Sequence, residues 1–67
     1  MDIFAERLKE LRMEKGFSQP QLAKATGISP NAICYWENQK RVPSANAIIT
    51  LAKFFNVSTD YLLGLED

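Results

Sequence analysis

Residues 18–37 read SQPQLAKATGISPNAICYWE, a pattern typical of two short helices joined by a tight turn. Ser18 is a favourable cap for the first helix, and a glutamine three residues later completes a Ser-x-x-Gln capping box. Gly27 ends that helix, because glycine takes a left-handed backbone conformation without a Cβ clash. Ser29 then caps the second helix, whose first residue, Pro30, already has a helical φ.

The two helices are expected at residues 19–26 and 30–37, with Asn38 as an alternative end of the second. A helix, a tight turn with glycine and a second helix within about 20 residues are typical of a DNA-reading unit. In such a unit the second helix enters the major groove of DNA. We therefore interpret the stretch as a helix-turn-helix motif.

Apolar residues recur at helical spacing on both sides of this motif. Phe4 and Leu8 mark a first helix, expected at residues 3–15. Two more helices are expected at residues 45–55 and 59–63. No strand pattern is present, so the sequence predicts an all-α fold, a compact five-helix bundle with the helix-turn-helix at its second and third helices.

The chain has 67 residues, enough for one domain over residues 1–67 and too few for a second core. No apolar run approaches the roughly 18 residues of a membrane span, and the first residues lack the apolar core of a signal peptide. We expect a cytoplasmic protein with no membrane partner.

Cys34 is the only cysteine, and the chain has no histidine. A disulfide within the chain, a thiolate metal cluster and a catalytic Cys-His or Ser-His pair are therefore excluded. The acids are dispersed, and no glycine-rich phosphate loop is present. We expect no enzyme activity, no metal, no cofactor and no small-molecule ligand.

Eight basic and eight acidic side chains leave the chain without net charge at neutral pH. They are segregated along the sequence, because five basic residues between Lys15 and Thr59 accompany a single acid, Glu37. The other seven acids lie toward the two ends. A basic centre suits the phosphates of a nucleic acid, although the same distribution also fits an ordinary mixed, solvated surface.

The run LRMEKGFSQ at residues 11–19 resembles the start of the lambda-repressor-like helix-turn-helix domains, also called the Cro or XRE type. The similarity extends in register from Phe4 to Gly64. It implies a bundle of five helices that binds operator DNA, usually as a dimer. The other matching segments are Leu22-Ala23, Gly27-Ile28-Ser29, Ile33-x-x-Trp36-Glu37-Asn38, Pro43-Ser44, Leu51-Ala52-Lys53 and Asn56-Val57-Ser58-x-Asp60-Tyr61-Leu62-Leu63-Gly64.

The resemblance implies that five residues form the base-reading face of the second motif helix. Asn31 can pair with an adenine edge, and Tyr35 can donate its hydroxyl or lay its ring against a thymine methyl. Asn31 also fits as a plain first-turn residue and Tyr35 as an idle surface aromatic. Cys34 is expected as a small helix-face residue without a metal role. The full set is Pro30, Asn31, Ala32, Cys34 and Tyr35.

The resemblance also implies phosphate contacts from Gln19, Asn38, Lys40 and Arg41. Two amide side chains and two cations fit this role, because amides donate to phosphate oxygens and cations release counterions.

Arg12 and Glu37 match a structural ion pair of the family, although Arg12 also fits as an ordinary surface arginine. The sequence departs from the family pattern at three positions. Pro20 and Pro30 replace polar side chains. Gln39 replaces a glycine that commonly ends the second motif helix, so either Asn38 or Gln39 must become left-handed.

These features together predict a sequence-specific DNA-binding transcriptional regulator, a repressor of phage or bacterial type that acts as a dimer on a near-palindromic operator. A candidate dimer patch near the C-terminus has a second interpretation, in which its members merely close the core. An alternative function is a protein-interaction module of the same fold, antitoxin-like or an accessory regulator, with weak or no DNA reading. The patch consists of Tyr61, Leu62, Leu63 and Leu65.

Overall fold

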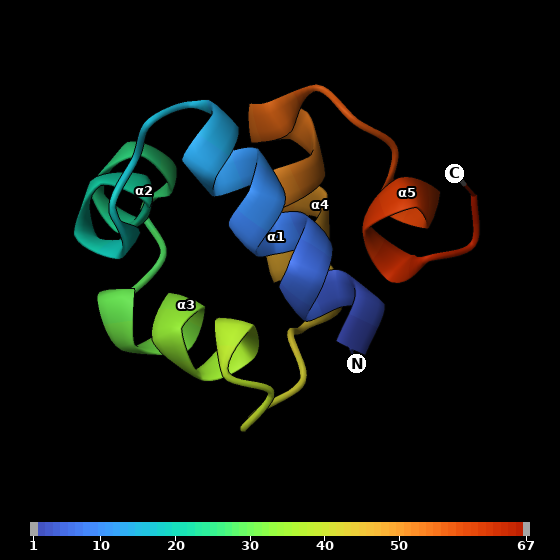
Figure 1. The fold of residues 1–67 in the computed structure, drawn as a ribbon, viewed down its shortest axis with the longest axis horizontal. Helices are drawn as coiled ribbons and strands as arrows, with labels where there is room; N and C mark the ends of the chain where they lie inside the picture. Colours follow the sequence, from blue (N-terminus) through green and yellow to red (C-terminus); the bar gives the residue numbers. More distant parts are fainter. Residues whose placement is uncertain (1, 67) are drawn as a thin grey trace.

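The computed structural model describes residues 2–66 and contains, within them, five α-helices and no strand (Figure 1). The all-α fold class is confirmed. Met1 and Asp67, which the predicted domain 1–67 includes, lie outside the described residues. The helices are α1 (Asp2–Glu14), α2 (Gln19–Thr26), α3 (Pro30–Glu37), α4 (Ala45–Phe55) and α5 (Thr59–Leu63).

The predicted bounds of α2 to α5 are confirmed, whereas α1 begins and ends one residue earlier than residues 3–15. The early end follows from the turn after the helix. The Phe17 N–H donates to the Arg12 carbonyl over 3.1 Å, and the Gly16 N–H donates to the Met13 carbonyl over 2.9 Å. These bonds turn the chain away at Lys15, so this residue lies in the turn.

Serine caps determine where α2, α3, α4 and α5 begin. In each case the hydroxyl oxygen accepts a hydrogen bond from the backbone N–H three residues later, over 2.9–3.2 Å. Such a cap contributes about 1 kcal/mol to helix stability. At α2 the Gln21 side chain also accepts the Ser18 N–H, which completes the predicted capping box. The four caps are Ser18, Ser29, Ser44 and Ser58.

The core forms where all five helices meet. Figure 1 shows α1 across the middle of the molecule, with α2 and α3 on one side and α5 on the other. The rings of Phe4 and Trp36 join α1 to α3 edge to face, with centroids 6.2 Å apart. The buried cluster comprises Phe4, Leu8, Leu22, Ala23, Ile33, Trp36, Ile48, Leu51, Ala52, Phe55 and Leu62.

The radius of gyration of the Cα atoms is 10.5 Å, close to the value of about 11 Å expected for a compact chain of this length. The packing of α1 against α3, and of α2 against both α3 and α4, holds the second and third helices in a fixed relation. None of the helices within residues 2–66 has the length and apolar character needed to cross a membrane.

Candidate nucleic-acid interface

The helix-turn-helix consists of α2, a three-residue turn and α3. Gly27 has a φ of 76°, and its N–H donates to the Ala23 carbonyl over 2.9 Å, which ends α2. Leu22 and Ala23 from α2 and Ile33 from α3 are buried together in the core. Because Ala23 is small, α3 can approach α2 closely at this point. The predicted motif is therefore present.

One side of α3 faces solvent and the other faces the core. Ile33 and Trp36 are buried. The five residues of the predicted base-reading face do not all lie on the opposite side, because Ala32 packs against the core cluster. Of these, Pro30, Asn31 and Tyr35 are exposed, and Ala32 and Cys34 are half-buried. This face carries no charged side chain of its own.

Arg12 and Glu37 form the predicted ion pair between α1 and α3. The carboxylate accepts two hydrogen bonds from the guanidinium, Nε to Oε2 over 2.8 Å and Nη2 to Oε1 over 3.0 Å. Nη1 donates to the Phe17 carbonyl over 2.7 Å. The side chains are only 12% and 4% exposed. The hydrogen bond that Arg12 donates to Glu37 raises the pKa of Arg12, against the opposing effect of burial.

Gln19 extends this ion pair to α2. Its Nε2 donates to Glu37 Oε1 over 3.1 Å, so one carboxylate connects α1, α2 and α3. The contact holds the side chain predicted to touch phosphate at the start of α2. The negative charge of Glu37 is matched inside the protein by the positive charge of Arg12.

Gln39 is the residue that becomes left-handed after α3, with a φ of 61°, whereas Asn38 has a φ of −94°. The turn carries two hydrogen bonds, from the Gln39 N–H to the Trp36 carbonyl over 3.1 Å and from the Lys40 N–H to the Tyr35 carbonyl over 2.8 Å. This is the Schellman arrangement, formed here without glycine.

Asn38 is directed back toward α3. Its Nδ2 lies 2.9 Å from the Cys34 carbonyl oxygen and 3.4 Å from Cys34 Sγ. The amide therefore helps to close the end of the helix, a role that the sequence did not reveal.

Lys40 and Arg41 are exposed on the loop after α3. The guanidinium carbon of Arg41 lies 5.1 Å from the centroid of the Tyr35 ring. The sequence assigned Tyr35 to base contact and Arg41 to phosphate contact, and it did not predict that the two side chains touch. The available signal was their separation of six positions around a turn that folds the chain back on the helix.

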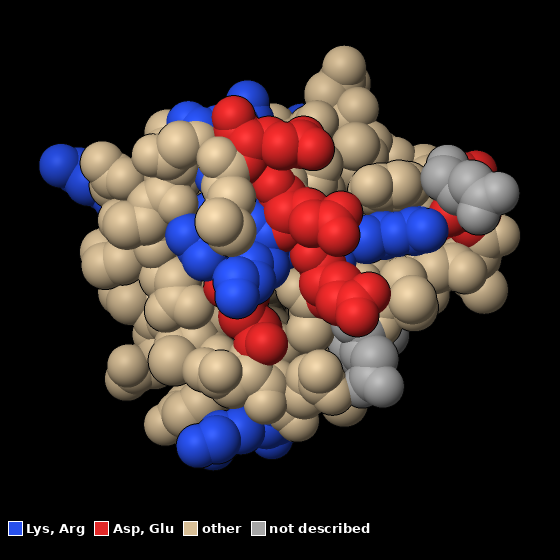
Figure 2. Space-filling view, in the orientation of Figure 1, with Lys and Arg blue, Asp and Glu red and all other residues tan. Residues whose placement is uncertain are grey.

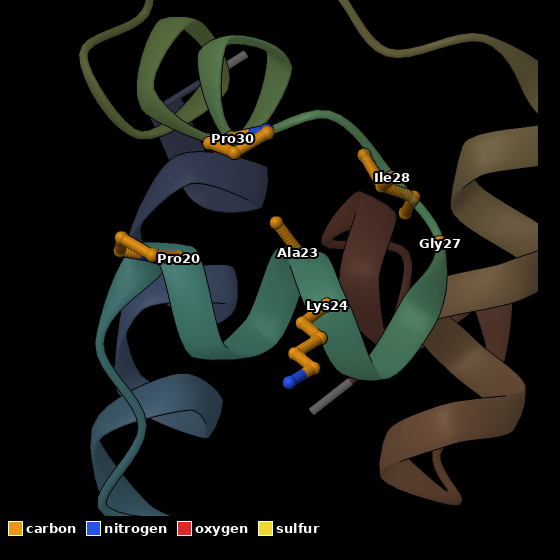
Figure 3. Close-up of a pocket in the computed structure, with 6 residues that line it drawn as sticks. All are labelled: Pro20, Ala23, Lys24, Gly27, Ile28 and Pro30. Carbon is orange, nitrogen blue, oxygen red and sulfur yellow. The ribbon is translucent and has the colours of Figure 1, made fainter.

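A shallow hollow of about 330 Å³ lies between α2 and the start of α3 (Figure 3). Pro20 and Pro30, which depart from the family pattern, both line it and lie in the first turns of the two helices. Lys24 is its charged lining residue. The others are Ala23, Gly27 and Ile28. The two prolines therefore lie on the same hollow, each near the N-terminal end of its helix.

The predicted dimer patch requires a correction, because Leu62 is fully buried in the core and cannot lie on a surface. Tyr61 and Leu63 are half-buried, and Leu65 is 73% exposed. Arg7 of α1 covers the Tyr61 ring with its guanidinium carbon 4.2 Å from the centroid. The same guanidinium donates to the Tyr61 and Glu66 carbonyls. The accessible part of the patch is therefore centred on Leu65.

Acidic side chains form a row over α1, with basic side chains on both sides (Figure 2). Glu6, Glu10 and Glu14 follow at four-residue spacing along this helix, and all three are exposed. The row lies on a helix outside the motif. It holds three of the eight acidic side chains of the sequence.

Comparison with known proteins agrees with this arrangement. The chain is 37% identical over 62 residues to the HTH-type transcriptional regulator ImmR of Bacillus subtilis, with 92% of this chain and 49% of the regulator covered. It is 39% identical over 64 residues to the transcriptional activator BcrR of Enterococcus faecalis, covering 96% of this chain and 31% of the activator. The repressor protein C2 of Salmonella phage P22 is 33% identical over 61 residues, 91% of this chain and 28% of the repressor.

A solved structure has the same fold. The crystal structure of the restriction-modification controller protein C.AhdI from Aeromonas hydrophila matches with a TM-score of 0.81 and 33% identity, covering 91% of this chain and 92% of that one. The family model of the helix-turn-helix domain matches residues 5–67. The chain belongs to the helix-turn-helix domain family, of the Cro or XRE type.

Proposed function

We propose that the chain is a sequence-specific DNA-binding transcriptional regulator that works in the cytoplasm. The observation that carries the proposal is the Arg12–Glu37–Gln19 network, which fixes α2 and α3 and leaves one face of α3 open to solvent. A helix held in this way by its neighbours can enter the major groove as a rigid element. Recognition of this kind requires no bond-breaking chemistry, and we propose no enzyme activity.

The exposed face of α3 reads the bases in this proposal. Asn31, in the first turn, offers both a donor and an acceptor to an adenine edge. Pro30, Ala32 and Cys34 offer apolar contact, for example to thymine methyl groups. Each well-made contact would discriminate against a wrong base by about 1–3 kcal/mol.

Phosphates are held beside this face by Gln19, Lys40 and Arg41. The two cations supply the charge that releases counterions. Asn38, whose amide closes α3, contributes a phosphate contact through its remaining hydrogen-bonding capacity. These contacts position the helix without selecting a sequence.

We further propose that the protein represses transcription as a dimer on a near-palindrome, with half-sites about 34–36 Å apart. The relatives include both a repressor and an activator. Repression is therefore our own proposal and is not taken from the relatives. Leu65 marks the contact between copies. Leu65→Asp should give a monomer, whereas Met13→Asp, a matched change at another exposed position, should not. Mass in solution and on DNA tests this, and a monomeric parent in both would remove the dimer.

The affinity for random duplex DNA as a function of salt tests the whole proposal. Neutralised phosphates require a negative slope of log affinity against log salt, of about −0.9 per phosphate. The double substitution Lys40→Ala/Arg41→Ala should reduce that slope by about two. The control Lys9→Ala/Lys53→Ala removes the same charge from exposed positions on α1 and α4 and should change it much less. No binding at low salt would instead favour the protein-interaction module.

A further inference from the structure

The Arg41 guanidinium lies over the Tyr35 ring, on the solvent side of α3. The 5.1 Å from Cζ to the ring centroid is within the roughly 6 Å range of a cation–π contact. Tyr35 is 37% exposed and Arg41 is exposed. Within residues 2–66, the contact of the Arg41 guanidinium is with the Tyr35 ring.

The backbone turn after α3 produces this contact. The hydrogen bond from the Lys40 N–H to the Tyr35 carbonyl, over 2.8 Å, brings the loop back beside the last turn of the helix. The left-handed Gln39 allows that reversal. Arg41, the residue after Lys40, is thereby placed next to the side chain of Tyr35 rather than pointing away from α3.

We propose that Tyr35 is a positioning residue, whose ring holds the Arg41 guanidinium in the orientation in which it contacts a DNA phosphate. The inference rests on the proposed function and gives Tyr35 a different role from the base contact expected from the sequence. A free arginine loses side-chain freedom when it binds, and holding it in place beforehand reduces that cost. Tyr35 therefore increases the affinity for DNA only by way of Arg41, and the increase does not depend on the DNA sequence.

Positioning Arg41 and contacting a base require different features of the Tyr35 side chain. A ring face covered by a guanidinium is not available to a thymine methyl group. A positioning ring needs its aromatic face and does not need its hydroxyl. Phenylalanine should therefore replace Tyr35 without loss, whereas leucine, with similar bulk and no π face, should not.

A double-mutant cycle on random-duplex affinity at fixed low salt tests the proposal. Tyr35→Leu and Tyr35→Ala should each weaken binding about two- to fivefold, the range expected for an exposed cation–π contact. Tyr35→Phe should bind as the parent does. Arg41→Ala should weaken binding further and reduce the salt slope by about 0.9. In the Arg41→Ala background, Tyr35→Leu should have no additional effect.

Other results overturn the proposal. Equal losses from Tyr35→Phe and Tyr35→Leu would assign the effect to the hydroxyl. A loss from Tyr35→Leu that persists without Arg41 would show direct contact with DNA or a structural role, and thermal unfolding of the same variants separates those two. If the parent binds but the cycle is additive, only the positioning role fails. If the parent does not bind random DNA at low salt, the proposed function fails with it.

Discussion

Gln39 stores backbone strain at the end of the helix that is proposed to read DNA. Its φ of 61° costs an L-residue about 1–2 kcal/mol, and glycine instead loses about 0.5–1 kcal/mol of extra entropy on folding. Gln39→Gly should therefore raise the free energy of unfolding by about 0.5–1 kcal/mol, or the Tm by about 2–8 °C. Thermal unfolding measures the change.

Lys40→Gly is the matched control for that substitution, because Lys40 follows directly and does not have a positive φ. Glycine there brings only its entropic cost, so the variant should be less stable than the parent. A loss of stability in Gln39→Gly as well would mean that Gln39 is not left-handed in solution.

Glu37 is the acceptor on which three elements depend, since it binds both Arg12 and Gln19. Glu37→Ala leaves the guanidinium, 12% exposed, without its partner and should cost about 3 kcal/mol, the low end for a broken buried pair. Glu10→Ala, at an exposed position, should change stability by less than about 0.5 kcal/mol. Denaturant unfolding at neutral pH makes the comparison. A loss for Glu37→Ala as small as that of the control would contradict the structural role.

The pH dependence of this pair follows from the raised pKa of Arg12, caused first by its hydrogen bond to Glu37. A group whose pKa is higher in the folded state stabilises the protein below its unfolded pKa. That contribution disappears only as the pH rises through the folded value. Titration of Arg12 therefore leaves the pair intact through the neutral and mildly alkaline range.

Residue identity predicted some contacts and not others. The partnership of Arg12 and Glu37 could be predicted because the family resemblance supplied a pair 25 positions apart. The inward turn of Asn38 and the stack of Arg41 on Tyr35 could not, because both depend on side-chain rotamers around one turn. The sequence limited the left-handed residue to two candidates, and only the backbone distinguishes Gln39 from Asn38.

At the level of elements, helix limits were predictable because short-range chemistry determines them. A serine and the N–H three residues later set each start from α2 to α5. The burial of Leu62 was not predictable in the same way. A five-residue helix such as α5 has too few turns to show an apolar stripe, so its inward side is decided by its neighbours.

The docking of α5 on α1 can be tested through Gly64. An added Cβ there would lie 2.7 Å from Ile3 Cγ2, and the φ is +80°. Gly64→Ala should therefore combine a left-handed penalty of about 1–2 kcal/mol with about 1 kcal/mol or more of overpacking. Gly16→Ala, with φ +72° and no such neighbour, should show the penalty alone. Chemical denaturation of both variants measures the difference.

A second substitution separates strain from packing in this test. Ile3→Ala removes the methyl group at 2.7 Å and leaves Ile3 Cβ at 3.1 Å from the added Cβ. In the Ile3→Ala background, Gly64→Ala should therefore cost less than in the parent, and its cost should approach that of Gly16→Ala. If Gly64→Ala and Gly16→Ala cost the same from the start, α5 does not press on α1 as the structure has it.

For the whole molecule, the relevant property is how its charges are distributed. The net charge is zero, but α1 carries an acidic row, whereas the sequence between Lys15 and Thr59 is basic. Long-range attraction to DNA depends on the summed field, so the row should slow association without touching DNA. Replacing Glu6, Glu10 and Glu14 by Gln should raise the association rate constant about tenfold at low salt. The gain should vanish near 1 M salt, where the screening length is about 3 Å.

Replacing the same residues by Asp retains the charge and should leave the rate unchanged. Stopped-flow association with labelled duplex measures these rates, and a slower rate for the Gln variant would show that the acidic row makes a favourable contact of its own.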